Sequence, residues 1–289
     1  MKRGKHEWII DVVVYTLLIV FCFLCIYPFW FVLVSSFNEG HDMMLGGVYW
    51  WPRKPTLENY IMFFRQTSWF DAIKVSILRT VVGASVTSLF TCLVGYALSR
   101  RKLMFGNVFR FLFVFSMYVS GGLIPFYVVL RLVGLLNSFM VYILPTALSL
   151  YFVMVGINFF RSIPESLYEA AELDGSSEIN TFIRVVLPLS SAFIATLALF
   201  SAVGQWNSWL DSVYYVNDKT LRPMAYWMIS IINRTQTNNS AQDLSDTVTL
   251  TTMATQSTAV IVAIAPILCV YPFLQKYFVK GMMIGSVKE

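Results

Sequence analysis

The chain has 289 residues, of which 57% are hydrophobic, 16% aromatic and only 13% charged. Soluble domains carry about 25% charged residues, so an ordinary core cannot hide this much apolar surface and much of it must face lipid. The length accommodates about six membrane spans of roughly 20 residues each. This composition excludes a soluble enzyme, a nucleic-acid-binding module and a disulfide-stapled secreted domain. In a membrane protein, the formal net charge of +5 is evidence about the orientation of the chain in the membrane, and it does not indicate an anionic partner.

Every cysteine lies inside an apolar run, whereas a disulfide framework needs cysteines in loops of an oxidising compartment. We therefore interpret them as small apolar fillers. They are Cys22, Cys25, Cys92 and Cys269. The first two share a helix face, but no further Cys or His lies near them, so no metal site is expected.

Six charge-free runs predict transmembrane helices. In chain order they cover residues 12–37, 80–99, 111–130, 132–160, 185–210 and 247–275. The first is too long for a signal-peptide core and lacks a small-x-small cleavage pattern, so we expect it to be retained. Gly and Pro inside the later runs are tolerable where neighbouring helices satisfy the backbone. The sequence predicts an all-α membrane protein with six transmembrane helices.

The placement of Lys and Arg predicts the orientation of these helices. Six spans put both termini on one side, together with the loops 100–110 and 161–184. The cluster Arg100, Arg101 and Lys102 lies on that side. Because positive charge favours the inside, we expect both termini to be cytoplasmic. The long segments 38–79 and 211–246 are then external, and loops of this length are usually functional.

The predicted spans contain no ionisable residue within these bounds, and both His6 and His41 lie outside them. An ion-coupled transporter needs ionisable groups at membrane depth. An intramembrane enzyme needs carboxylates, histidines or a metal motif there. Neither alternative is favoured. No G-x-x-x-x-G-K-[ST] loop is present to hold a nucleotide. Such a protein is either passive or driven by a partner.

The predicted cytoplasmic loop 161–184 contains a helix that such a partner can bind. Ser162 and Glu165 fit a capping box, and Pro164 is tolerated in a first helical turn. A short helix is predicted to run through Leu173, and Gly175 is placed to end it in a left-handed cap.

One face of this predicted helix is shallow and apolar, and acidic residues surround it. The apolar positions are Ile163, Leu167, Ala170 and Ala171, and the acidic ones are Glu165, Glu169, Glu172 and Asp174. Two interpretations stay open: a helix that docks into a groove of a partner protein, or an amphipathic helix that rests on the bilayer. Surface helices are usually rich in Lys and Arg, so acidity favours the protein partner.

The loop resembles the EAA loop, the signature of permease subunits in ATP-binding-cassette importers. The matching pattern is Glu169-Ala170-Ala171, three residues, Gly175, nine residues, Val185, one residue, and Leu187-Pro188. The family usually has Ile where Val185 stands. Further segments resemble the carbohydrate branch, namely the second permease of the maltose importer and, more closely, permeases of polysaccharide-fragment importers. These segments are residues 95–100, 121–127, 161–164, 206–207 and 280–288.

The resemblance covers residues 27–288 and implies a type I importer permease fold, similar to the methionine importer's membrane domain, with a cytoplasmic coupling helix. It implies a non-enzymatic subunit of the bacterial cytoplasmic membrane that needs no cofactor of its own. The implied partners are a second, homologous permease, two cytoplasmic ATPase subunits that bind ATP and magnesium, and an external solute-binding protein. The implied cargo is an oligosaccharide, either derived from a polysaccharide or uronate-bearing. A permease for a non-sugar solute is the alternative.

The resemblance also assigns regions and residues. The expected divisions are an N-terminal region 1–70, a permease core 71–280 and a cytoplasmic tail 281–289. The residues expected to couple to the ATPase are Glu169, Ala170, Ala171, Asp174, Gly175, Leu187 and Pro188.

A sugar path is expected near the outer end of the fifth predicted span. Aromatic faces and amides suit a polyhydroxylated ligand, which needs apolar stacking and hydrogen bonds together. The candidates are Gln205, Trp206, Asn207 and Trp209. An interfacial aromatic belt is the alternative explanation for the same residues.

Overall fold

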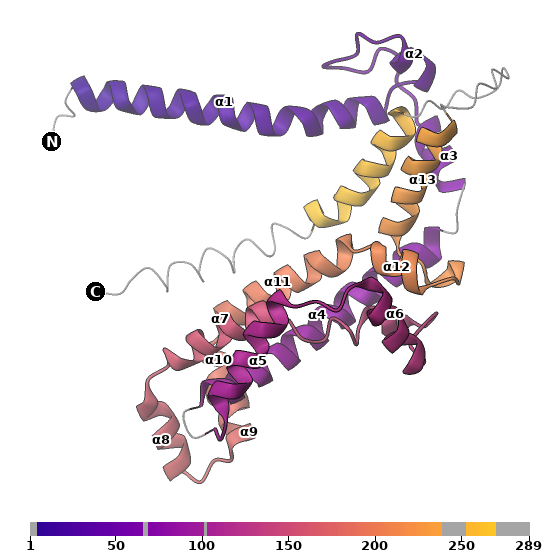
Figure 1. Cartoon of the computed structure of the whole chain (residues 1–289). Helices are drawn as coiled ribbons and strands as arrows, with labels where there is room; N and C mark the ends of the chain where they lie inside the picture. Colours follow the sequence, from indigo (N-terminus) through magenta and orange to yellow (C-terminus); the bar gives the residue numbers. More distant parts are fainter. Residues whose placement is uncertain (1–4, 66–68, 101–102, 239–252, 270–289) are drawn as a thin grey trace. The chain divides into compact units, whose positions relative to one another are not determined.

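The computed structural model describes residues 5–65, 69–100, 103–238 and 253–269 (Figure 1). Within these ranges the regular structure is helical, apart from an isolated bridge that pairs Asn38 with Pro55. The described residues fall into two compact units. The first lies within Met1–Ser68 and Met228–Pro266, and the second within Trp69–Trp227 and Ile267–Glu289.

The first unit contains α1, α2, α3, most of α13 and most of the helix Met253–Cys269. Their bounds are α1 Lys5–Ser36, α2 Gly40–Met44, α3 Glu58–Arg65 and α13 Met224–Asn238. The longer helices of the second unit are α4 Trp69–Ser99, α5 Gly106–Tyr118, α6 Leu123–Leu132, α7 Leu150–Arg161, α8 Glu165–Leu173 and α11 Ser191–Asn207. Its shorter elements are η1 Phe139–Tyr142, α9 Glu178–Thr181, η2 Phe182–Val186, α10 Leu187–Leu189, α12 Leu210–Tyr215 and η3 Lys219–Leu221.

By length and composition, two of the described helices suffice to cross a membrane, Trp8–Ser36 and Trp69–Ser99. Two further spans arise if each of two bent helix pairs is taken as one, which gives up to four. Met253–Cys269 is a shorter apolar helix, and the rest of the predicted sixth span lies outside the described residues. The structure therefore has the apolar helices of a membrane protein, and the count of six stays a prediction.

The run 111–130 was expected to form one helix, and this is wrong. α5 and α6 are separate helices that meet at 117°. Gly122 has φ +81°, a left-handed value that is available to glycine at no steric cost, and its amide donates to Ser120 Oγ at 3.2 Å. The Gly-Gly pair therefore breaks the helix, although composition alone left the run continuous.

A second bend, of 84°, separates the helices that end at Leu189 and begin at Ser191. Pro188 has no amide hydrogen, and its ring crowds the carbonyl four residues earlier, so a regular α-helix cannot run through it unchanged. The chain forms the π-helical turn η2 directly before Leu187 and Pro188. The bend thus has a local cause in the sequence.

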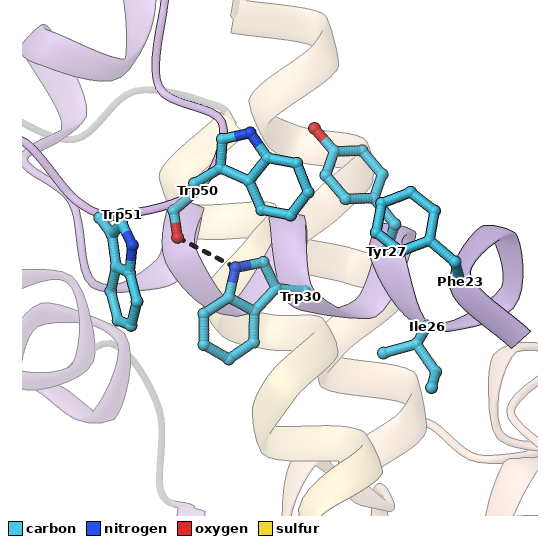
Figure 2. A pocket seen from close by; sticks show the side chains of 6 residues that line it. All are labelled: Phe23, Ile26, Tyr27, Trp30, Trp50 and Trp51. Atoms are coloured by element: carbon cyan, nitrogen blue, oxygen red, sulfur yellow. Dashed lines mark hydrogen bonds between the residues drawn. The ribbon is translucent and has the colours of Figure 1, made fainter. Parts of the chain in front are cut away.

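In the first unit, aromatic side chains fix the segment around Trp50 and Trp51 beside α1 (Figure 2). The indole nitrogen of Trp30 donates to the carbonyl oxygen of Trp50 at 3.0 Å, and the Tyr27 and Trp50 rings lie 5.2 Å apart. Aromatic and aliphatic side chains enclose a cavity of about 310 Å³ there. They are Phe23, Ile26, Tyr27, Trp30, Trp50 and Trp51.

In the second unit, α4 packs along both α7 and α11 (Figure 1). Glycine permits the close approach of α4 to α11, because a Cβ at Gly83 would lie 2.7 Å from the amide of Gln205. The pair α4 and α7 meets through Phe160, which is 1% exposed. α4 is therefore the central helix of this unit.

Arg79, in the middle of α4, is 1% exposed and fully engaged with protein groups. Its guanidinium donates to Asp211 Oδ2 at 2.6 Å and to the Ser208 carbonyl at 3.0 Å. It also donates to Gln205 Oε1 at 3.1 Å and 3.2 Å, and it lies 4.3 Å from the centre of the Tyr142 ring. These contacts attach the residues between and at the ends of α11 and α12 to α4.

This arrangement corrects the expectation that the spans are free of charge. α4 begins at Trp69 rather than near Thr80, so the candidate span Trp69–Ser99 contains Arg79. A buried charge is tolerable when it is paired and hydrogen-bonded, as Arg79 is.

Asp211→Ala removes the carboxylate that pairs with Arg79 and leaves the charge of Arg79 buried without an ionic partner. We expect the free energy of unfolding to fall by about 3–5 kcal/mol, the usual cost of breaking a buried ion pair from one side. Chemical unfolding of the purified chain in detergent measures this change.

The matched control is Lys54→Ala, which breaks the exposed pair between Lys54 and Glu39, whose side chains are 61% and 33% exposed. Exposed pairs contribute little because water screens them. Equal losses of stability in the two variants would contradict the structural role of Arg79.

Candidate functional site

The loop helix α8 begins at Glu165, with Pro164 as the residue before its first turn. The expected capping box is wrong. Ser162 instead ends α7, with helical φ −77° and ψ −12°, and its hydroxyl donates to the Phe159 carbonyl at 2.7 Å. Because an N-cap residue needs non-helical dihedral angles, Ser162 cannot cap α8.

The expected left-handed end of α8 is confirmed. Gly175 has φ +74°. Its amide donates to the Glu172 carbonyl at 3.0 Å, and the Ser176 amide donates to the Ala171 carbonyl at 2.9 Å. These two bonds form a Schellman motif, which satisfies the last carbonyls of the helix and turns the chain sharply. The turn therefore depends on a residue that adopts positive φ without strain.

One side chain holds α8 against the unit. Tyr168 is 6% exposed, its hydroxyl donates to the Phe160 carbonyl at 3.1 Å, and its ring stacks 6.4 Å from that of Tyr96. The guanidinium carbon of Arg100 lies 4.4 Å from the centre of the same ring. Burial raises the pKa of the Tyr168 phenol, so the group stays neutral and acts as a hydrogen-bond donor.

The remainder of α8 is largely exposed, including the acidic and small residues of the matched pattern. Glu169, Ala170, Asp174 and Gly175 are exposed, and Ala171 is half-buried. Leu173 is 89% exposed. α8 therefore presents an open surface of leucine, alanine and carboxylates.

A cluster at the end of α4 ties this loop to the long helix. Tyr96 Oη donates to Glu178 Oε2 at 2.6 Å, and Arg100 donates to Glu178 Oε1 at 3.3 Å. We call Tyr96, Arg100, Tyr168 and Glu178 the loop joint. In the sequence, residues 95–100 carry part of the resemblance and Arg100 is part of the orientation signal, but no pattern singles out Glu178. The signal that could have indicated the loop joint is the pair of Tyr96 and Arg100 at the end of an apolar run.

The other residues of the matched pattern lie beyond α9. Leu187 is half-buried and packs against the cluster of Tyr96, Phe160, Tyr168 and Phe182. Pro188 is exposed and lies next to the π-helical turn. The pattern thus spans both the exposed helix and the bend that follows it.

The four candidates for the sugar path lie around the end of α11. Asn207 is exposed, and Trp206 and Trp209 are half-buried. Gln205 is 6% exposed, and its amide nitrogen donates to Thr146 Oγ1 at 2.7 Å and to the Tyr142 carbonyl at 3.2 Å. Because its oxygen accepts from Arg79, both ends of the Gln205 amide are occupied by protein groups.

Comparisons with known proteins agree with this architecture. Residues 88–284 match the family described as binding-protein-dependent transport system inner membrane component. The polygalacturonan/rhamnogalacturonan transport system permease protein YtcP of Bacillus subtilis (strain 168) is 35% identical over 96% of this chain and 98% of its own length. Protein LplC of the same strain is 37% identical over 92% of this chain and 90% of its own length.

Among solved structures, the chain resembles a bacterial ABC transporter involved in the import of the acidic polysaccharide alginate. The TM-score is 0.84 at 24% identity, over 96% of this chain and 99% of that chain. This likeness confirms the expected permease fold. The chain therefore belongs to the family of inner membrane components of binding-protein-dependent transport systems, and it is an ABC transporter permease subunit rather than an enzyme.

Proposed function

We propose that this chain carries oligosaccharides, among them fragments of acidic polysaccharides, across the cytoplasmic membrane as part of an ATP-driven importer. The observation that carries the sugar assignment is the 35% identity, over 96% of the chain, to a permease named for polygalacturonan and rhamnogalacturonan. Polygalacturonan consists of uronate units, so a uronate-bearing cargo follows from the same relative. The match at residues 88–284 supports a permease core at 71–280.

The proposed assembly has two permeases, this chain and a homologous one, with two ATPase subunits that bind ATP and magnesium and an external solute-binding protein. The family description itself names dependence on a binding protein. The excess of Lys and Arg at 100–102 supports cytoplasmic termini.

In this assembly α8 is the helix that docks into a groove of one ATPase subunit. Its exposed leucine and alanines give close apolar contact, and Glu169 and Asp174 give charges for basic groups of the ATPase. Ala170 and Ala171 keep the docking face shallow, and Gly175 gives the chain its sharp exit. Leu187 and Pro188 set the bend through which the chain continues into α11. The tail 281–289 lies outside the described residues.

The sugar path is proposed at the end of α11, where Trp206, Asn207 and Trp209 offer aromatic faces and an amide. Gln205 belongs to the same region, and in the described conformation its amide holds Arg79 and Thr146. We therefore assign it the task of positioning this segment.

The proposed function is tested with vesicles that contain the complete importer. Uptake of trigalacturonate is expected only when ATP and the sugar-loaded binding protein are both present. Uptake of an amino acid or phosphate instead of any oligosaccharide would establish the alternative, a permease for a non-sugar solute.

Gly175→Val tests the turn after α8. Positive φ costs a residue with a Cβ about 1–2 kcal/mol, and a β-branched residue more. Since 1.4 kcal/mol corresponds to tenfold, we expect sugar-stimulated ATP hydrolysis to fall by at least about tenfold while the subunits still co-purify.

The matched control is Gly134→Val, because Gly134 also has positive φ, +75°, and a Cβ there would likewise meet nothing within 4 Å. The control carries similar backbone strain away from α8. Equal losses of ATP hydrolysis in both variants, or wild-type activity of Gly175→Val, would contradict the role of this turn.

Tyr96→Phe tests the loop joint, because it keeps the ring and removes the bond to Glu178. Glu178 is largely exposed, so we expect a loss of only about 1 kcal/mol. The number of sugars transported per ATP hydrolysed should then fall by about fivefold, since the loop and α4 are held together less tightly.

Glu178→Gln should show the same lowered ratio, whereas Tyr151→Phe serves as the control because Tyr151 is 60% exposed on α7. A proportional fall of transport and hydrolysis in Tyr96→Phe, with their ratio unchanged, would show that the joint does not couple the two.

A further inference from the structure

The break between α5 and α6 borders a cavity of about 450 Å³ in the second unit. Its lining includes Ser120, Gly121, Gly122, Phe126, Val129 and Tyr215. The volume falls within the range of roughly 300–1,000 Å³ that is typical of small-molecule sites. None of these residues belongs to the matched loop pattern or to the sugar-path candidates.

The backbone at this break needs polar surroundings. Residues 119–122 are not helical, although they interrupt a segment that is otherwise apolar enough to span a membrane. Non-helical backbone at membrane depth is tolerated only where it is covered by protein or lines a water-filled cavity. A lipid tail cannot satisfy these peptide groups, so they need cover by protein or contact with water or a polar solute.

Part of the cavity wall is aromatic. The Tyr215 ring lies 5.9 Å from that of Phe126 at an interplanar angle of 65°, and 6.3 Å from that of Tyr127. The backbone carbonyl of Tyr215 accepts from the Asn137 amide at 2.8 Å, which fixes the residue independently of its side chain. Tyr215 itself is half-buried, so part of its ring faces open space.

The chemistry of the described lining selects a class of ligand. It combines aromatic faces, a serine hydroxyl, a phenol and glycine backbone with the apolar side chains of Leu123, Pro125 and Val129, and it contains neither a carboxylate nor a basic side chain. Aromatic faces stack on the C–H faces of a sugar ring, while hydroxyl and peptide groups bond its oxygens. A free ion or a purely apolar molecule would use only one half of this surface.

We propose that this cavity is a subsite of the transport path that binds one pyranose ring of the oligosaccharide, stacked against Tyr215. The inference rests on the proposed function and adds a place in this subunit where the cargo is held. The subsite lies at the helix break between α5 and α6.

Cysteine labelling in vesicles tests the subsite in a complete importer whose native cysteines are replaced by serine. Val129→Cys places a thiol at the cavity, and Val128→Cys is the matched control, since Val128 is similarly exposed on the same helix, 47% against 53%, but is not part of the described lining. With a non-hydrolysable ATP analogue present, a membrane-impermeant maleimide should label the thiol of the Val129→Cys variant. Trigalacturonate-loaded binding protein should slow this labelling severalfold more than sugar-free binding protein does, and it should have no such effect on the Val128→Cys variant.

Two substitutions of Tyr215 and one control substitution test the stacking. Tyr215→Ala should lower the number of sugars transported per ATP by about tenfold, a loss expected for an aromatic stacking partner, whereas Tyr215→Phe keeps the ring and should stay close to the wild-type value. The control, Tyr151→Ala, removes an exposed tyrosine on α7 that is not part of the described lining, and it should have no effect.

The contrary results separate a failure of the subsite from a failure of the proposed function. If the wild type transports trigalacturonate, the proposed function stands. The subsite is nevertheless wrong if loaded and sugar-free binding protein slow the labelling of the Val129→Cys variant equally. It is also wrong if the thiol of this variant is never labelled. Wild-type transport by Tyr215→Ala has the same meaning. If the wild type transports no oligosaccharide, the proposed function fails and the subsite fails with it.

Discussion

The structure depends on polar contacts that fasten α4 to two distant parts of the second unit. In the middle of the helix, Arg79 holds Asp211 and Gln205 at the break between α11 and α12. At its end, Tyr96 and Arg100 hold Glu178. Hydrogen bonds and charges have strict geometry, whereas apolar helix faces slide over one another at little cost. α4 is therefore fixed in register with both the loop of α8 and the segment that carries Tyr215.

This arrangement gives the proposed transport cycle a physical path. In the proposed cycle, a push on the exposed face of α8 is transmitted to α4 through the loop joint, and from α4 to α11 and α12 through Arg79. Coupling requires that the ATPase and the sugar bias the same pair of conformations, and rigid-body movement of packed helices is a common way to achieve it. The bends beside Gly122 and Pro188 divide the apolar segments of this unit into separate helices.

The sequence was informative wherever a local rule decides the conformation. Gly175 predicted the end of α8 because few other residues adopt positive φ without strain, and the apolar runs predicted the helical class. Ser162 misled because α7 continues to Arg161, held by the buried Phe160. Arg79 misled because its partner, Asp211, lies 132 residues away and no local pattern links them. Composition likewise hid the break at Gly122, since Gly-Gly alone does not distinguish a kink from two helices.

The claim that α4 and the loop move as one body is tested most directly by a distance measured between nucleotide states. Spin labels at Leu78→Cys on α4 and Ile179→Cys on α9 occupy exposed positions, 43% and 71%. Pulsed electron resonance on the assembled importer gives their separation with and without ATP. The account predicts the same narrow distance distribution in both states. A distance that shifts or broadens when ATP binds would show that the loop moves independently of α4 and would contradict it.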